Sequence, residues 1–122
     1  MKLYTIQMSS WRKAKERNVP FYDVTVKSGD KTFAPSWDIL MRYKNNSNIA
    51  EREKIYIKEF TKHMRQSYSL NTKYWIDFLS QEEVAIACYC KSAGFCHRYL
   101  LIDMFEKVCK IHDIKFEYKG DL

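Results

Sequence analysis

The feature that most constrains the fold is the run Val84 to Cys90, which reads VAIACYC. Its residues are small or apolar at nearly every position, and the run has the length of one strand. A strand without polar alternation is typical of parallel sheets, in which helices cover both faces. The run therefore predicts a buried strand within a layered α/β fold.

The neighbouring segments supply the other elements of such a fold. Lys2 to Met8 alternates as a strand does, with Leu3 and Ile6 on opposite sides. The further predicted strands are residues 21–26 and 114–118, and residues 9–18 are expected to form a polar loop or a short basic helix. The predicted helices are a short one within 33–44, started by Pro35 and Ser36, a long one over about 49–65, a short one over 71–79, and one over 97–111.

Helical spacing also predicts which side chains these helices bury. Asn48 and Glu51 form a capping box at the start of the long helix. The expected buried sets are Ile49, Tyr56, Phe60 and Met64 with Ile57 beside them, then Tyr74, Trp75 and Phe78, then Leu101, Met104, Phe105, Val108 and Ile111. The order of elements predicts a single domain over residues 1–122, a small Rossmann-like three-layer sandwich with a mostly parallel sheet of about four strands.

Composition bounds the class of protein. With 46% hydrophobic residues and only three Gly and two Pro among 122 residues, the chain favours one packed core over long linkers. No apolar run approaches the roughly 20 residues that a membrane helix needs, and the N-terminal residues lack the pattern of a signal peptide. We therefore expect a cytoplasmic protein that does not contact membranes.

A cluster of polar residues follows the buried run. Cys96, His97 and Arg98 begin the predicted helix at 97–111, after a turn at residues 91–95. Helix N-termini attract anions, and ligands of open α/β sheets bind beyond the carboxyl ends of strands. We expect Arg98 to hold a phosphate, His97 to act as a hydrogen-bond donor or general acid, and Cys96 to be a thiolate with a lowered pKa. The alternative is that Arg98 is a surface residue and His97 a helix-start hydrogen-bonder.

Positive charge is concentrated near the first strand. The formal net charge is +6, and Trp11 is followed by the bases Arg12, Lys13, Lys15 and Arg17. In a parallel sheet this segment and the loop at Lys27 open on the same edge as Cys96–Arg98, which predicts one basic crevice for a nucleotide or a nucleic acid. Asp23 would bind a ribose hydroxyl or act as a base there; alternatively it orients a neighbouring Arg or caps a loop. The alternative for the basic run is a solvated helix face.

The cysteines permit a further interpretation. Cys88 and Cys90 point to the same side of a strand, and Cys96 and His97 return across the turn, so four soft ligands for structural zinc are available. Their spacing is not that of a zinc knuckle, and the alternative is that these cysteines serve as small apolar residues. We therefore expect no cofactor, with zinc as the open alternative. Cys109 is expected to be a packing residue.

Three function classes remain. The chain has no Walker A motif, no G-x-G-x-x-G and no serine nucleophile elbow, which excludes the standard NTPase, dinucleotide and hydrolase assignments. An anion-binding protein, with or without nucleotide-processing activity, is the first class. The second is a non-catalytic adaptor or inhibitor that binds a macromolecular partner, for which the Lys-, Ile-, Asn- and Tyr-rich composition suits a phage or bacterial accessory protein. The third is a protein with a structural zinc site.

Three segments carry a family resemblance: FAPSWDILMRYK, YIKEFTKHMRQS and VAIACYCKSAGFCHRYLL. Together they resemble the domain-of-unknown-function family 488 from Tyr4 to about Val108, and the FCHR element is the most specific part. The resemblance implies a compact Rossmann-like α/β fold. It carries Cys88, Cys96, His97 and Arg98 onto the family's marked positions, and more loosely Pro35 and Trp37, which becomes a candidate ligand-binding residue. The chain departs from the family at Cys90, where many members have an acidic residue.

Overall fold

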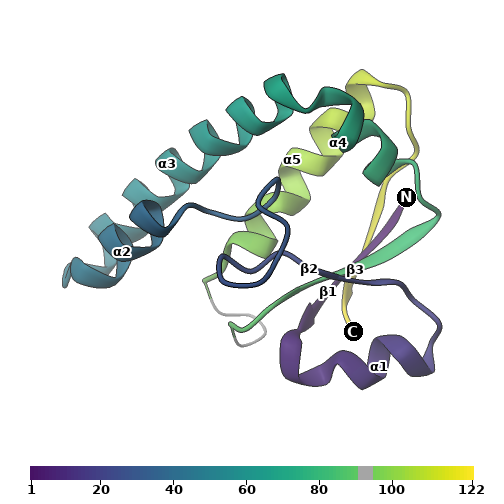
Figure 1. Ribbon diagram of the computed structural model, residues 1–122, viewed down its shortest axis with the longest axis horizontal. Helices are drawn as coiled ribbons and strands as arrows, with labels where there is room; N and C mark the ends of the chain where they lie inside the picture. The colour runs from purple at the N-terminus through teal and green to yellow at the C-terminus, as the bar shows by residue number, and fades with distance from the viewer. Residues whose placement is uncertain (91–94) are drawn as a thin grey trace.

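The apolar run that begins at Val84 forms an interior strand of a four-stranded sheet (Figure 1). The structure, a computed structural model, describes residues 1–90 and 95–122. The strands are β1 (Lys2–Gln7), β2 (Phe21–Asp23), β3 (Glu83–Cys88) and β4 (Glu117–Asp121). Their order is β2-β3-β1-β4, and the three pairings between them are parallel. The predicted fold class, a small Rossmann-like α/β sandwich, is confirmed.

Helices cover both faces of this sheet (Figure 1). On one face, Ala14 of α1 (Trp11–Glu16) packs with Ile6, Ala85 and Ala87. The other face carries a larger core, centred on Phe33 and on side chains from α3 (Ile49–Leu70), α4 (Thr72–Leu79) and α5 (His97–Ile111). Leu3 and Ile6 belong to the two different cores, as the alternation of the first strand predicts.

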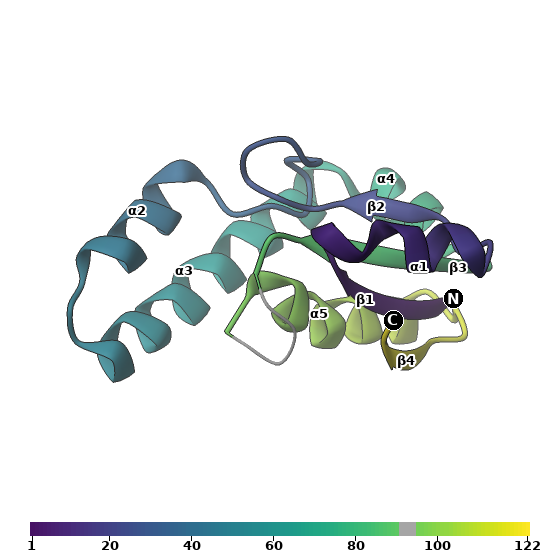
Figure 2. The ribbon, with the colours of Figure 1, turned by 90° about the horizontal axis from the view of Figure 1, so that it is seen from below.

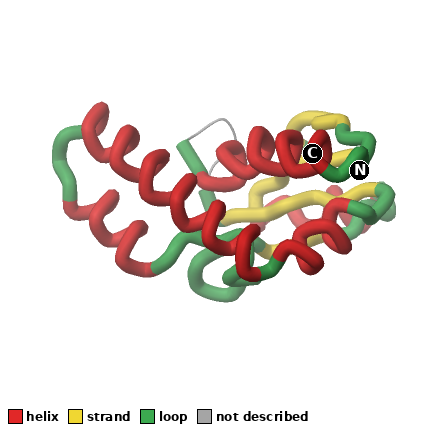
Figure 3. The backbone as a smooth tube through the Cα atoms, turned by 90° about the horizontal axis from the view of Figure 1, so that it is seen from above, coloured by secondary structure: helices red, strands yellow, loops and turns green. Residues whose placement is uncertain are grey.

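Side-chain caps begin the two helices that extend beyond the sheet. The Ser36 hydroxyl accepts a hydrogen bond from the Ile39 amide and starts α2 (Trp37–Asn45). The Asn48 side chain accepts one from the Glu51 amide at 3.1 Å and starts α3. The two helices pack side by side and project away from the sheet (Figures 2 and 3). None of the helices in the described residues has both the length and the apolar character that a membrane crossing requires.

Several predicted boundaries are corrected. The long helix continues past residue 65 to Leu70, since residues 66–70 contain no breaker and Tyr68 packs on Trp75. β3 ends at Cys88, whose partner Gln7 is the last residue of β1. β4 begins at 117 rather than 114. The predicted turn at residues 91–94 lies outside the described residues.

Four of the expected buried side chains are exposed. Ile49 and Ile57 lie on the part of the structure that projects beyond the sheet, where little covers them. Ile111 ends α5 and is also exposed. Tyr74 turns its hydroxyl outward to Asp30 instead of entering the core. Helical spacing identifies a face but not how far along the helix a neighbour covers it.

The predicted second strand is also shorter than expected. It ends at Asp23, whose carboxylate accepts hydrogen bonds from the Thr25 amide (2.8 Å) and the Ser28 hydroxyl (2.6 Å) and turns the chain into a loop. Gly29 closes this loop against the backbone, because a Cβ there would lie 2.6 Å from the carbonyl oxygens of Asp23 and Thr25. The loop thus has a fixed shape at the carboxyl edge of the sheet.

Asp30 ties this loop to α4 and gives the fold a pH dependence. Burial raises the pKa of Asp30, but hydrogen bonds from the Tyr22 and Tyr74 hydroxyls outweigh it and hold the pKa below its usual value. A lowered pKa in the folded state stabilises the protein above the unfolded-state pKa of about 3.9, and this contribution is lost as the pH falls through the folded-state pKa.

We therefore expect Asp30→Asn to lower the free energy of unfolding at pH 7 by about 1 kcal/mol. The difference from the wild type should be smaller at pH 3, which lies below the unfolded-state pKa of about 3.9, because part of this contribution is lost there. Urea unfolding at both pH values measures this, with the exposed Asp103→Asn as control. An equal loss of stability at pH 7 and pH 3 would contradict the assignment.

Candidate functional site

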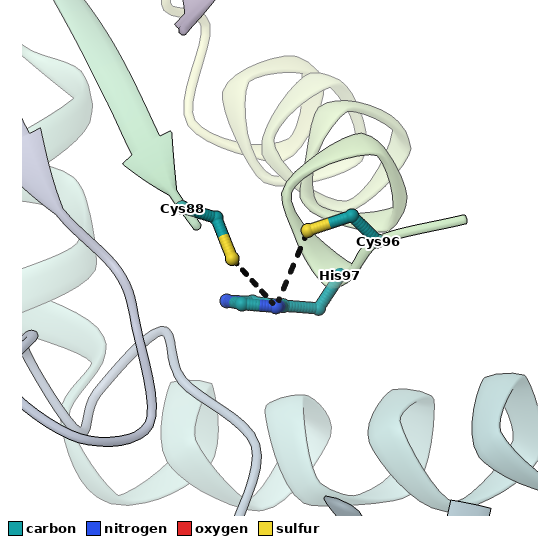
Figure 4. Close-up of side chains that lie close together, drawn as sticks. All are labelled: Cys88, Cys96 and His97. Atoms are coloured by element: carbon teal, nitrogen blue, oxygen red, sulfur yellow. Dashed lines mark hydrogen bonds between the residues drawn. The ribbon is translucent and has the colours of Figure 1, made fainter. Parts of the chain in front are cut away.

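Three predicted site residues meet where β3 ends and α5 begins (Figure 4). Cys88 is the last residue of β3, Cys96 is the N-cap of α5, and His97 is its first residue. The His97 Nδ1 lies 3.7 Å from the Cys96 Sγ and 4.0 Å from the Cys88 Sγ. The ligand atoms of these three buried residues all lie within 4.8 Å of one another, which is close enough to hold a metal ion.

A backbone carbonyl sets the direction of the His97 ring. Its Nε2–H donates to the Val24 oxygen at 2.5 Å, and this carbonyl can only accept. The other nitrogen, Nδ1, therefore presents its lone pair to the two thiols. The loop after β2 supplies this carbonyl, so the second strand and the cysteine-bearing third strand both contribute to the site.

Cys90 joins the same group of sulfurs. Its Sγ lies 3.8 Å from the Cys88 Sγ, although the residue itself is exposed. Hydrogen bonding by Cys88 and Cys96 lowers the pKa of the Cys90 thiol. The pKa of Cys96 is raised instead, by hydrogen bonding with Cys88 and Cys90 and by burial. The expected lowering of the Cys96 pKa is therefore wrong, because the neighbouring sulfurs outweigh the helix N-terminus.

Arg98 is neither a surface residue nor directed at the solvent. Its side chain is 0% exposed, and its Nη1 donates to the Cys90 carbonyl at 2.8 Å and to the Cys88 carbonyl at 3.4 Å. The guanidinium also lies 4.8 Å from the centre of the Tyr99 ring. Arg98 thus joins the start of α5 to the end of β3 and holds the cysteine-bearing segment in place.

A pocket of about 290 Å³ opens beside the cluster. Cys88, Cys90, Cys96 and His97 line one part of it. Lys27 from the capped loop and Trp37 from α2, both predicted as ligand-binding residues, line the same pocket. The structure therefore brings together the cysteine and histidine residues, one predicted base and the predicted aromatic residue.

The lining residues that sequence reasoning missed include Tyr43, Lys44, Tyr56 and Phe95. The Tyr43 and Phe95 rings stack at 5.3 Å between centroids, and Tyr56 meets both rings edge-on. One signal was available. Trp37, Leu40 and Tyr43 stand at helical spacing in the sequence, which indicates an apolar face on α2. This face lines the pocket.

The remaining predicted residues lie elsewhere. Arg12, Lys13, Lys15 and Arg17 belong to α1 and the residue after it, on the opposite face of the sheet, and none of them is among the described residues lining the pocket. The prediction that all the cationic segments share one crevice is therefore wrong, because α1 covers the other face. Asp23 caps its own loop, and Arg98 is likewise absent from the described pocket lining.

The fold and the site define a class: a Rossmann-like α/β protein with a buried cysteine–histidine cluster at the carboxyl edge of its sheet. Residues 5–108 match the family model DUF488-N3a, described as the active DUF488-N3 subclade. The chain belongs to this family, and the predicted resemblance is confirmed. Comparison with curated proteins and with solved structures gave no significant match.

The position of Arg98 gives a stability prediction. Arg98→Met keeps an unbranched apolar stem but removes the guanidinium that donates to the Cys88 and Cys90 carbonyls. We expect it to lower the free energy of unfolding by about 2–4 kcal/mol, measured by urea denaturation. The exposed Arg65→Met is the matched control, expected within about 0.5 kcal/mol of wild type. Equal stability of the two variants would show that Arg98 does not hold this junction.

Proposed function

We propose that the protein binds a small phosphate-bearing ligand with a flat ring, such as a nucleotide, in the pocket beside the cysteine–histidine cluster. The observation that carries this proposal is the combination of an aromatic wall with two lysines, Lys27 and Lys44, around one cavity. Aromatic faces stack on bases, and ammonium groups neutralise phosphate.

The charge and size of the pocket support this ligand class. No Asp or Glu is among the described residues that line the pocket, so the two lysines have no opposing charge there. The volume of about 290 Å³ lies at the lower end of ligand pockets, which favours a mononucleotide over a dinucleotide. Trp37 is 55% exposed at this site, which leaves its ring free to stack on a ligand.

A nucleotide-processing reaction here would use the thiols. Because the His97 Nε2–H is engaged by Val24, the nitrogen that faces the cysteines is the one able to accept a proton. In the metal-free protein, the Cys96 thiol would be the nucleophile, and the His97 Nδ1 would accept its proton as the sulfur attacks. Asp23 is bound to its own loop and takes no part in this proposal.

The test is a thermal-shift and calorimetric screen of the reduced protein against nucleotides and phosphosugars. A ligand at this site stabilises the fold by mass action. The double variant Lys27→Ala, Lys44→Ala should weaken binding at least about tenfold, which corresponds to about 1.4 kcal/mol. Lys31→Ala, on the same loop region but not among the described lining residues, should bind as the wild type does. Binding that is equal in all three proteins would contradict this pocket as the site.

A second function is favoured by the surface of α1. The Trp11 ring is 44% exposed, with the Arg12 guanidinium 5.3 Å and the Lys15 ammonium 6.0 Å from its centre. Trp11 and Lys15 also border an apolar hollow with Met8, Val19 and Phe21. An exposed aromatic ring between cations is the arrangement by which proteins bind single-stranded nucleic acid. We therefore propose that α1 contacts such a strand, separately from the pocket.

Fluorescence anisotropy with labelled single-stranded oligonucleotides tests this second function. We expect binding that weakens with added salt, and at least about a tenfold loss in Trp11→Ala, since stacking contributes about 1–3 kcal/mol per base. Trp37→Ala, which alters an exposed tryptophan of the pocket, is the matched control and should bind as the wild type does. If no oligonucleotide binds, or if the loss appears only in Trp37→Ala, the proposal for α1 fails.

A further inference from the structure

Four metal-binding side chains converge at the junction of β3 and α5. Cys88 and Cys90 come from the end of β3 and the segment just after it, and Cys96 and His97 come from the start of α5. The Cys88 and Cys90 sulfurs are 3.8 Å apart, and the His97 Nδ1 lies 4.0 Å from Cys88 and 3.7 Å from Cys96. The ligand atoms of Cys88, Cys96 and His97 lie within 4.8 Å of one another, and the Cys90 sulfur adjoins this group through Cys88.

These separations are those of ligands around a tetrahedral zinc ion. Zinc binds sulfur at about 2.3 Å and imidazole nitrogen at about 2.0–2.1 Å, so tetrahedral geometry sets sulfur–sulfur edges of about 3.8 Å and sulfur–nitrogen edges of about 3.6 Å. Three of the six edges of such a tetrahedron, Cys88–Cys90, Cys88–His97 and Cys96–His97, depart from these values by at most a few tenths of an ångström.

The surroundings also suit a metal. A zinc-bound histidine usually donates its second N–H to a carbonyl or carboxylate, which fixes the ring, and the His97 Nε2–H donates in this way to Val24. Zinc with three thiolates and one neutral histidine carries a net charge of −1. The fully buried Arg98, bonded to the carbonyls of Cys88 and Cys90, supplies a compensating positive charge. This charge balance accounts for a buried guanidinium that forms no ion pair with a carboxylate within residues 1–90 and 95–122.

We propose that Cys88, Cys90, Cys96 and His97 bind one zinc ion as a closed Cys₃His site. Four protein ligands leave no open position, so the ion has a structural role. It joins β3 to α5 and forms the base of the ligand pocket. Zinc-bound thiolates are not free nucleophiles, so the metal-loaded protein binds its ligand without covalent chemistry at Cys96. This inference is independent of the ligand, because its residues are the cysteines and histidine and not the lysines.

The test uses the reduced full-length chain, freed of metal by a chelator and titrated with Co²⁺, which replaces zinc in thiolate sites. We expect one equivalent to bind, with the intense visible absorption of tetrahedral cobalt and the ultraviolet charge-transfer band of cobalt thiolates. Zn²⁺ should displace it. Elemental analysis of protein purified from zinc-supplemented cells should also give one zinc per chain.

Two cysteine variants locate the ligands. Cys90→Ser, at an exposed position, should still fold but bind Co²⁺ at least about tenfold more weakly, with a weaker charge-transfer band. Cys109→Ser, on the same helix as His97 but outside the cluster, should bind as the wild type does. A folded, reduced protein that gives no tetrahedral cobalt spectrum overturns the zinc site. Unchanged affinity and spectrum in Cys90→Ser overturn the four-ligand assignment. Neither result bears on nucleotide binding, which is measured separately on the lysine variants.

Discussion

β3 is buried on both faces, and the rest of the structure depends on this burial. Five of its six residues are buried, so helices must cover the sheet above and below. Parallel pairing with β1 and β2 then places the carboxyl ends of three strands at one edge. The chain leaves β3 at that edge and returns there as α5. The geometry of a parallel strand and its following helix thus brings Cys88 close to Cys96 and His97.

Polar contacts hold this junction once packing has formed it. Arg98 donates to the carbonyls at the end of β3, and His97 donates to Val24 in the loop after β2. Both side chains are buried, and both donate to backbone oxygens. The residues of the family motif therefore act partly as structural elements. Their hydrogen bonds orient the sulfurs and the free imidazole nitrogen toward one point.

The layers of the fold separate two surfaces that the charge pattern had joined. The basic segment and the Cys–His–Arg segment both follow strands, which led to the prediction of one crevice. However, α1 turns under the sheet while α5 lies over it, so the bases of α1 and the cluster are assigned to different faces. The pocket instead takes its lysines from the capped loop and from α2. The lysines of the pocket and the bases of α1 therefore form two separate surfaces, and we propose a different anionic ligand for each.

The sequence by itself determined the local elements and the chemistry available to them. The apolar run identified β3, the Ser36 and Asn48 caps identified two helix starts, and the CHR element identified the start of α5, because each depends on residues close together in the chain. Tertiary structure alone decided which face of the sheet α1 covers and how much of α3 is exposed. It also brought Tyr43, Lys44, Tyr56 and Phe95 together around one pocket. It also decided that Arg98 points into the protein and that Cys90 joins the other thiols. These outcomes depend on contacts between residues far apart in the chain, and the periodicity of a single segment contains no information about its partner.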